Sequence, residues 1–125
     1  MKILIVDDSK AMRMIVSRVL RQSGFGDAEM VEAGNGLEAL AAIDAGAPDL
    51  VLCDWNMPEM NGIELLRALK EKGSTIPFGF VTSETTPEMR EQAIAAGALF
   101  LLGKPFTPDA FAEVLGSTGI AVPAT

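Results

Sequence analysis

Short apolar runs alternate with segments of helical periodicity along the whole 125-residue chain. Five runs of four to six residues are rich in Val, Ile, Leu and Phe, and most lack a strict alternation of apolar and polar positions. This pattern predicts β-strands that are buried on both faces. The expected strands are Lys2–Val6, Ala28–Ala33, Leu50–Cys53, Pro77–Val81 and Leu99–Leu102.

Between and after these runs, apolar residues recur at spacings of three and four, which predicts amphipathic helices. The expected helices are Lys10–Gln22, Leu37–Ala45, Gly62–Lys72, Pro87–Ala96 and Pro108–Leu115. Four basic residues of the first helix fall mostly opposite its apolar side and are expected to face solvent. They are Lys10, Arg13, Arg18 and Arg21.

Residues suited to helix ends flank several of these segments. Ser9 is suited to cap the start of the first helix and Gly24 to stop it. Pro87 and Pro108 each fit the first turn of a helix. The pair Asn35-Gly36 is typical of a hairpin turn, but the next residues have helical periodicity, so we interpret it as a loop that opens a helix.

The regular alternation of strands and helices predicts an α/β fold with right-handed crossovers and helices on both faces of a parallel sheet. The length suits a flavodoxin-like, doubly wound (βα)5 fold with a five-stranded parallel sheet. Its strand order, 2-1-3-4-5, is adopted from known proteins of that fold. Residues 1–116 are expected to form this one domain, and residues 117–125 a flexible C-terminal tail.

Composition and charge exclude several classes of function. The net charge of −7 argues against nucleic-acid binding, and the absence of histidine excludes histidine-based catalysis and metal ligation. No apolar run approaches the ~20 residues needed to cross a bilayer, and the N-terminus does not have the pattern of a signal peptide. The single cysteine excludes an internal disulfide. We therefore expect a monomeric cytoplasmic protein that binds neither nucleic acid nor membrane.

Acidic residues end two of the predicted strands. Asp7 and Asp8 follow the first strand, and Asp54 follows the third, which is wholly apolar. In the adopted strand order these two ends flank the point where ligands bind. Three converging carboxylates repel one another unless a cation lies among them, and oxygen ligands open to water suit Mg²⁺. The sequence therefore predicts a magnesium site.

Two more polar residues follow the last strands, Thr82 after the fourth and Lys104 after the fifth. A nucleophilic carboxylate, a divalent cation, a hydroxyl donor and a fixed positive charge together can stabilise a phosphoryl group in transfer to and from an aspartate. Taken singly, Asp7, Asp8 and Thr82 have a plainer interpretation as helix caps, and Lys104 as a solvated loop residue. Their joint occurrence favours the phosphoryl site.

Two residues beside Asp54 receive plainer interpretations. Cys53 precedes it in an apolar strand and is interpreted as a small core residue. Trp55 is expected to be half-exposed beside the site, where its indole would report metal binding.

Four stretches carry a resemblance to a known family: "ILIVDDS", "DLVLCDWNMPEMNG", "VTSE" and "GALFLLGKPF". Each is weak alone, but together, in this order and spacing, they are specific. The chain resembles, over about its whole length, the response-regulator receiver domains of two-component signalling, and most closely the single-domain chemotaxis response regulators.

The resemblance implies a phosphoacceptor, Asp54, that receives its phosphoryl group from a histidine kinase. It also implies that Thr82 and Lys104 contact the phosphoryl group, and that Asn56 and Glu84 tune its lifetime. The implied Mg²⁺ ligands are Asp7, Asp8, Asp54 and the backbone carbonyl of Asn56. The Lys104-Pro105 peptide bond is expected to be cis.

One position departs from the family pattern. Many receivers have Tyr or Phe three residues before the lysine, where this chain has Leu101. Phe100, one residue earlier in the strand, is expected to face the other way. The resemblance further implies that a downstream protein binds the face formed by the fourth helix, the fifth strand and the fifth helix.

Other functions remain open. One alternative is a receiver-fold module that binds its partner without phosphorylation, which is favoured by Leu101 in place of the usual aromatic residue. Another is a phosphate sink. A metal-dependent phosphatase is disfavoured because it needs two acids two residues apart, whereas Asp7 and Asp8 are adjacent. An FMN carrier is disfavoured because these acids would repel its phosphate. We expect a signalling protein that catalyses only its own phosphorylation and dephosphorylation.

Overall fold

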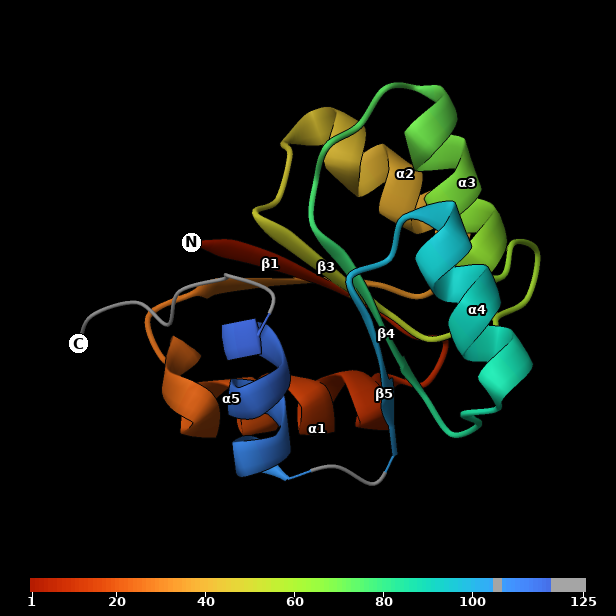
Figure 1. Ribbon diagram of the computed structural model, residues 1–125. Coiled ribbons are helices and arrows are strands. Elements are labelled where there is room, and N and C mark those ends of the chain that lie inside the picture. Colours follow the sequence, from red (N-terminus) through yellow and green to blue (C-terminus); the bar gives the residue numbers. More distant parts are fainter. Residues whose placement is uncertain (105–106, 118–125) are drawn as a thin grey trace.

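The computed structural model describes residues 1–104 and 107–117. Its strands are β1 (Lys2–Val6), β2 (Glu29–Ala33), β3 (Leu50–Cys53), β4 (Phe78–Thr82) and β5 (Phe100–Gly103). They form one parallel sheet in the order β2-β1-β3-β4-β5 (Figure 1). The predicted fold class and strand order are therefore confirmed.

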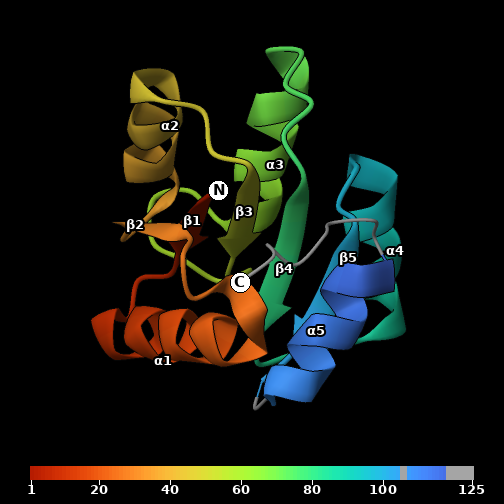
Figure 2. The ribbon, with the colours of Figure 1, turned by 90° about the vertical axis from the view of Figure 1, so that its left-hand side faces the viewer.

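Helices cover both faces of this sheet. They are α1 (Lys10–Leu20), α2 (Gly36–Ala45), α3 (Gly62–Glu71), α4 (Pro87–Ala96) and α5 (Pro108–Ser117). Helices α1 and α5 lie on one face, and α2, α3 and α4 lie on the other (Figures 1 and 2). Of the expected tail at 117–125, only Ser117 is described, as the last residue of α5. The rest of that tail lies outside the described residues, as does Pro105 of the expected cis peptide.

The core consists of two layers because side chains of the buried strands alternate between the two faces of the sheet. Every residue of β3 and β4 is buried. Val6 and Cys53 pack among α2, α3 and α4, whereas Ile5 and Leu52 pack on the side of α1 and α5. The continuous apolar runs seen in the sequence are explained by this two-sided burial.

The last strand follows the same rule. Phe100 belongs to the layer on the α1 and α5 side, and Leu101 belongs to the layer on the other side. The expectation that the two side chains face opposite ways is confirmed. The ring of Phe100 lies over Gly79 of the neighbouring strand, where a β-carbon would collide with it. Leu101 is 4% exposed and so is a core residue.

The predicted helix starts are also confirmed. The hydroxyl of Ser9 accepts the N–H of Met12 at 3.2 Å, and Asn35 caps α2 in the same way. Pro87 occupies the first turn of α4. The largest boundary differences are two residues: α5 ends at Ser117, not Leu115, and α1 ends at Leu20, not Gln22. An irregular turn, η1 (Arg21–Phe25), comes next.

Within the two described ranges, no helix combines the length and the apolar character that crossing a bilayer would require.

Candidate functional site at the carboxyl edge of the sheet

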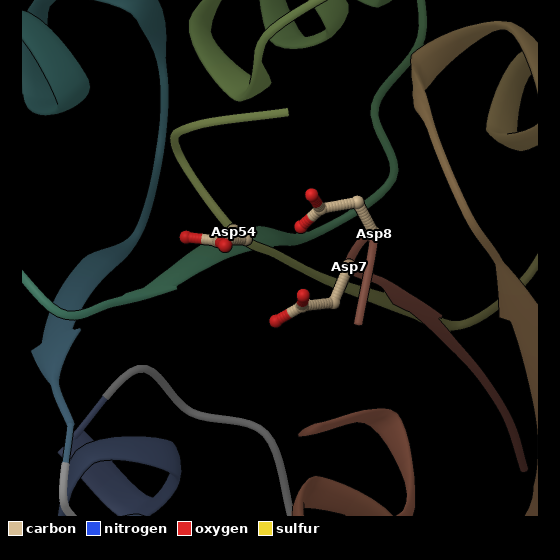
Figure 3. A group of neighbouring side chains, drawn as sticks. All are labelled: Asp7, Asp8 and Asp54. Atoms are coloured by element: carbon tan, nitrogen blue, oxygen red, sulfur yellow. The ribbon is translucent and has the colours of Figure 1, made fainter. Parts of the chain in front are cut away.

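The register of β1 and β3 brings two of the acidic residues together. Val6 pairs with Cys53, so Asp7 and Asp54 leave the sheet side by side. The Asp54 N–H donates to the Val6 carbonyl at 2.9 Å, which continues the ladder past the end of β3. Parallel strands end at the same edge of a sheet, and Asp8 follows one residue later. Figure 3 shows the three side chains gathered at this edge.

The three carboxylates form a compact group of oxygen ligands. One carboxylate oxygen from each of Asp7, Asp8 and Asp54 lies within 4.8 Å of the other two. Asp7 is buried, Asp54 is partly buried and Asp8 is exposed, so the group opens to solvent on one side. Carboxylate oxygens that leave room for water match the coordination that Mg²⁺ prefers. The residues present therefore fit the predicted metal.

Lys104 follows β5, the outermost strand, and its side chain reaches this group along the carboxyl edge of the sheet. Its Nζ atom donates to Asp7 Oδ2 at 2.9 Å and lies 3.6 Å from Asp54 Oδ2. The backbone N–H of Lys104 donates to the Thr82 carbonyl at 2.8 Å, which fixes the chain where β5 ends. The alternative that Lys104 is a solvated loop lysine is thus wrong, because its side chain is only 13% exposed.

The environment of Asp54 favours its neutral form. Burial is the largest influence and raises the pKa of this carboxyl group above its ordinary value. Lys104 acts against burial, whereas the charges of Asp7 and Asp8 raise the pKa further. A hydrogen bond from the Trp55 N–H to Asp54 Oδ1, at 2.7 Å, favours the ionised form. A cation bound beside Asp54 would lower this pKa and so favour the carboxylate.

The remaining predicted residues lie around this edge in different environments. Thr82 is fully buried at the end of β4, and its Oγ1 accepts the Glu84 N–H at 3.5 Å. Asn56 and Glu84 are exposed. The role of the Asn56 carbonyl as a metal ligand stays a prediction, as do the roles of Thr82 and Glu84.

The interpretation of Cys53 as a core residue is confirmed. Cys53 is fully buried, and burial raises the pKa of its thiol well above the ordinary value. It therefore remains a thiol and does not compete with Asp54 as a nucleophile.

The expectation that Trp55 is half-exposed is wrong, whereas the expected response of its indole to metal binding stays a prediction. Trp55 is 9% exposed, and its ring packs against that of Phe80 in a tilted arrangement with centroids 4.8 Å apart. The Gly62 N–H donates to the Trp55 carbonyl at 2.8 Å and holds the loop after β3 against the sheet. A β-carbon at Gly62 would meet the Asp54 carbonyl oxygen, so this close return of the chain needs glycine.

One residue near the site differs from its expected placement. Arg13 was expected to face solvent, but its side chain is 16% exposed. Its Nη1 donates to the Asp7 carbonyl at 2.6 Å, and its Nε donates to Glu32 at 2.8 Å. Helical periodicity could not reveal this arrangement, because the acceptor at Asp7 is a backbone atom.

Comparisons with known proteins were made on the sequence and on the fold. The family model described as "Response regulator receiver domain" matches residues 3–115. Chemotaxis protein CheY-3 of Vibrio cholerae serotype O1 is 42% identical over 117 residues, which cover 92% of this chain and 88% of that protein. Chemotaxis protein CheY1 of Helicobacter pylori is 40% identical over 118 residues, which cover 92% and 94%.

A solved structure gives the same result for the fold. The structure of Vibrio cholerae chemotaxis protein CheY4 superimposes with a TM-score of 0.82 at 35% identity, covering 94% of this chain and 97% of that one. The family match spans the acidic group, Thr82 and Lys104 alike.

Proposed function

The chain belongs to the response regulator receiver domain family, and we propose that it is a phosphorylation switch of a two-component system. Asp54 accepts a phosphoryl group from a histidine kinase, and the phosphorylated form binds a downstream protein. The observation that carries this proposal is the gathering of Asp7, Asp8 and Asp54 within reach of Lys104 at one edge of the sheet.

In the proposed reaction, a carboxylate oxygen of Asp54 forms a bond to phosphorus. The P–N bond to the donor's imidazole breaks, and the ring nitrogen keeps the electron pair. Lys104 then pairs with one phosphoryl oxygen and the Thr82 hydroxyl donates to another. Mg²⁺, bound by Asp7, Asp8, Asp54 and the Asn56 carbonyl, would offset the charge of the remaining oxygens.

The switch turns off by hydrolysis. A water molecule attacks phosphorus, the bond from phosphorus to the Asp54 oxygen breaks, and the carboxylate and inorganic phosphate are released. Water must approach through the solvent-open side of the site. Asn56 and Glu84 are both exposed, which supports their proposed influence on the lifetime of the phosphoryl group. In this sense the protein catalyses only its own phosphorylation and dephosphorylation.

The output is proposed to leave through the face formed by α4, β5 and α5. Ile94 of α4 is 53% exposed and Leu99, just before β5, is 42% exposed, so apolar contact area is available there. Leu101 lies buried beneath this face in place of the usual aromatic residue. Because relatives at about 40% identity are chemotaxis proteins, we propose that the downstream partner belongs to a chemotaxis system in the cytoplasm.

The first prediction tests the acceptor. Acetyl phosphate and Mg²⁺ should add one phosphoryl group to the protein, detected by intact-mass measurement, and peptide mapping should place it at Asp54. The Asp54→Asn variant should gain no phosphoryl group, because an amide is a poor nucleophile. Chelation of Mg²⁺ should also prevent the reaction.

Asp27→Asn provides the matched control, because Asp27 is an exposed acid just before β2, at the edge of the sheet opposite the site. It should be phosphorylated like the natural protein. A phosphoryl group on another residue, or equal modification of Asp54→Asn, would contradict the proposed acceptor.

A further inference from the structure

Arg13 connects three segments at the edge of the acidic group. It lies in α1, one turn after the helix begins, and its guanidinium bonds the carbonyl of Asp7 at the end of β1. It also bonds the side chain of Glu32, near the end of β2. A β-carbon on Gly34, in the next loop, would lie 3.7 Å from Arg13 Nη1. The guanidinium is therefore enclosed by protein.

We propose that Arg13 is a positioning residue for the metal site, and this inference rests on the proposed function. It holds the Asp7–Asp8 peptide so that both carboxylates lie where a divalent cation needs them. Arg13 does not touch the metal or the phosphoryl group. It acts through the backbone of two proposed ligands, as residues around a metal's direct ligands do in other sites.

Asp7 is held at four points, one of which is the hydrogen bond from its N–H to the Ala33 carbonyl at 3.1 Å. Lys104 pairs with Asp7 Oδ2, and the Ser9 N–H donates to Oδ1 at 2.9 Å. Arg13 holds the Asp7 carbonyl, which is the fourth point and belongs to the peptide bond that follows. The side chain and the backbone of this residue are thus fixed by different partners.

Asp8 depends on that backbone anchor more than Asp7 does. It is exposed, and among the described residues its carboxylate has no hydrogen-bond or ion-pair partner. Its position toward Asp54 is therefore set by the peptide that precedes it. Loss of the Arg13 bond leaves the metal to fix this peptide itself, so part of the binding free energy is lost in ordering it.

The geometry of arginine is essential to this role. The planar guanidinium bonds two acceptors on different strands at once, and the ammonium of lysine cannot reproduce this fork. Glu32 keeps the fork oriented, since it accepts the Nε–H while Nη1 faces Asp7. Because lysine retains the positive charge, Arg13→Lys separates the positioning role from plain electrostatic repulsion between Arg13 and the metal.

The test is a Mg²⁺ titration followed by the emission of Trp55, the only tryptophan, which directly follows Asp54. Arg13→Lys should raise the dissociation constant for Mg²⁺ by about 10-fold or more. Glu32→Gln should raise it by a smaller factor, because Arg13 remains but is held less firmly. In the metal-free protein, amide hydrogen exchange of Ser9 should be faster in Arg13→Lys than in the natural protein.

The matched control is Arg18→Lys in the same helix, because Arg18 is exposed and forms no ion pair within the described ranges. It should bind Mg²⁺ with unchanged affinity. If Arg13→Lys melts at a lower temperature but binds Mg²⁺ as the natural protein does, Arg13 is merely structural and the inference is overturned. If Arg13→Lys does not fold, an unchanged affinity in Glu32→Gln overturns it equally. If the natural protein itself does not respond to Mg²⁺, the proposed function fails and takes this inference with it.

Discussion

At Asp54 the protein holds a carboxyl group in surroundings that disfavour its charge. Burial and the neighbouring acids raise its pKa, and Lys104 offsets only part of this effect. Between the ordinary carboxyl pKa and the raised value, the folded state binds more protons than the unfolded state. Stability therefore falls as pH rises through this window. In the absence of metal, ionisation of Asp54 therefore lowers the free energy of unfolding.

The second prediction follows for Asp54→Asn in the presence of a chelator. The variant carries no charge at this position in either state, so at pH 7 it should melt a few degrees higher than the natural protein. The difference in unfolding free energy should grow as pH rises through the window and then level off. Urea unfolding at a series of pH values measures it. A natural protein more stable than Asp54→Asn at pH 7 would contradict the raised pKa.

The residue scale also separates what the sequence could and could not predict. Asp7, Asp54 and Lys104 were predicted to meet because each follows a strand whose end lies at the same edge. The burial of Trp55 was not predictable, because it depends on Phe80 from another strand. The contact of Arg13 with a backbone carbonyl likewise leaves no trace in a pattern of side chains.

At the scale of elements, α3 controls the loop that follows the acceptor. Its first turn has a capping box, in which the Asn61 side chain accepts the Glu64 N–H at 2.9 Å. Glu64 in turn accepts the Asn61 N–H at 3.1 Å. Gly62, which follows Asn61, donates its N–H to the Trp55 carbonyl and so ties the start of the helix to the residue after Asp54. The cap that starts this helix therefore also fixes the conformation of the loop between Asp54 and the helix.

The third prediction concerns that cap. Asn61→Ala should lower the free energy of unfolding by about 1 kcal/mol, because the first turn of α3 loses its side-chain acceptor. Glu64→Gln is the control and should change stability little, since glutamine also fits the box. Denaturant unfolding measures both variants. Equal losses in the two would show that charge at the helix start, not the Asn61 cap, stabilises this turn.

All element boundaries were predictable to within two residues, the end of α1 included. The expected helix reaches Gln22, but after Leu20 the chain turns through η1, where Gly24 adopts a φ of 105°. Gly24 was correctly interpreted as a stop, since this conformation favours glycine. Phe25, the last residue of η1, is buried in the core layer on the α1 and α5 side.

At the scale of the whole molecule, the strand order was beyond the reach of the residue pattern. Strands β1, β3 and β4 are predominantly apolar and almost wholly buried, so nothing in their pattern says which of them pair. The order was taken from known flavodoxin-like proteins and proved correct. The acidic group requires β1 and β3 to be neighbours, because its carboxylates come from the ends of these two strands.

The fourth prediction uses that dependence on the complete fold. Mg²⁺ should stabilise the natural protein because only the folded chain gathers the three carboxylates. At 100 times the dissociation constant the gain should be about 2.7 kcal/mol. Thermal unfolding with Mg²⁺, against sodium chloride of equal ionic strength, measures it. Asp8→Asn should reduce the gain, and equal effects of the two salts would contradict specific binding.

The ion pair between Lys104 and Asp7 joins residues 97 positions apart. A chain emerging from the ribosome exposes Asp54 well before Lys104 has been synthesised. Contacts of such long sequence separation also form slowly during folding. A nascent or half-folded molecule therefore carries the nucleophile without its ammonium partner. The proposed phosphoryl transfer therefore requires a fully synthesised and folded chain, and a kinase would phosphorylate only such chains.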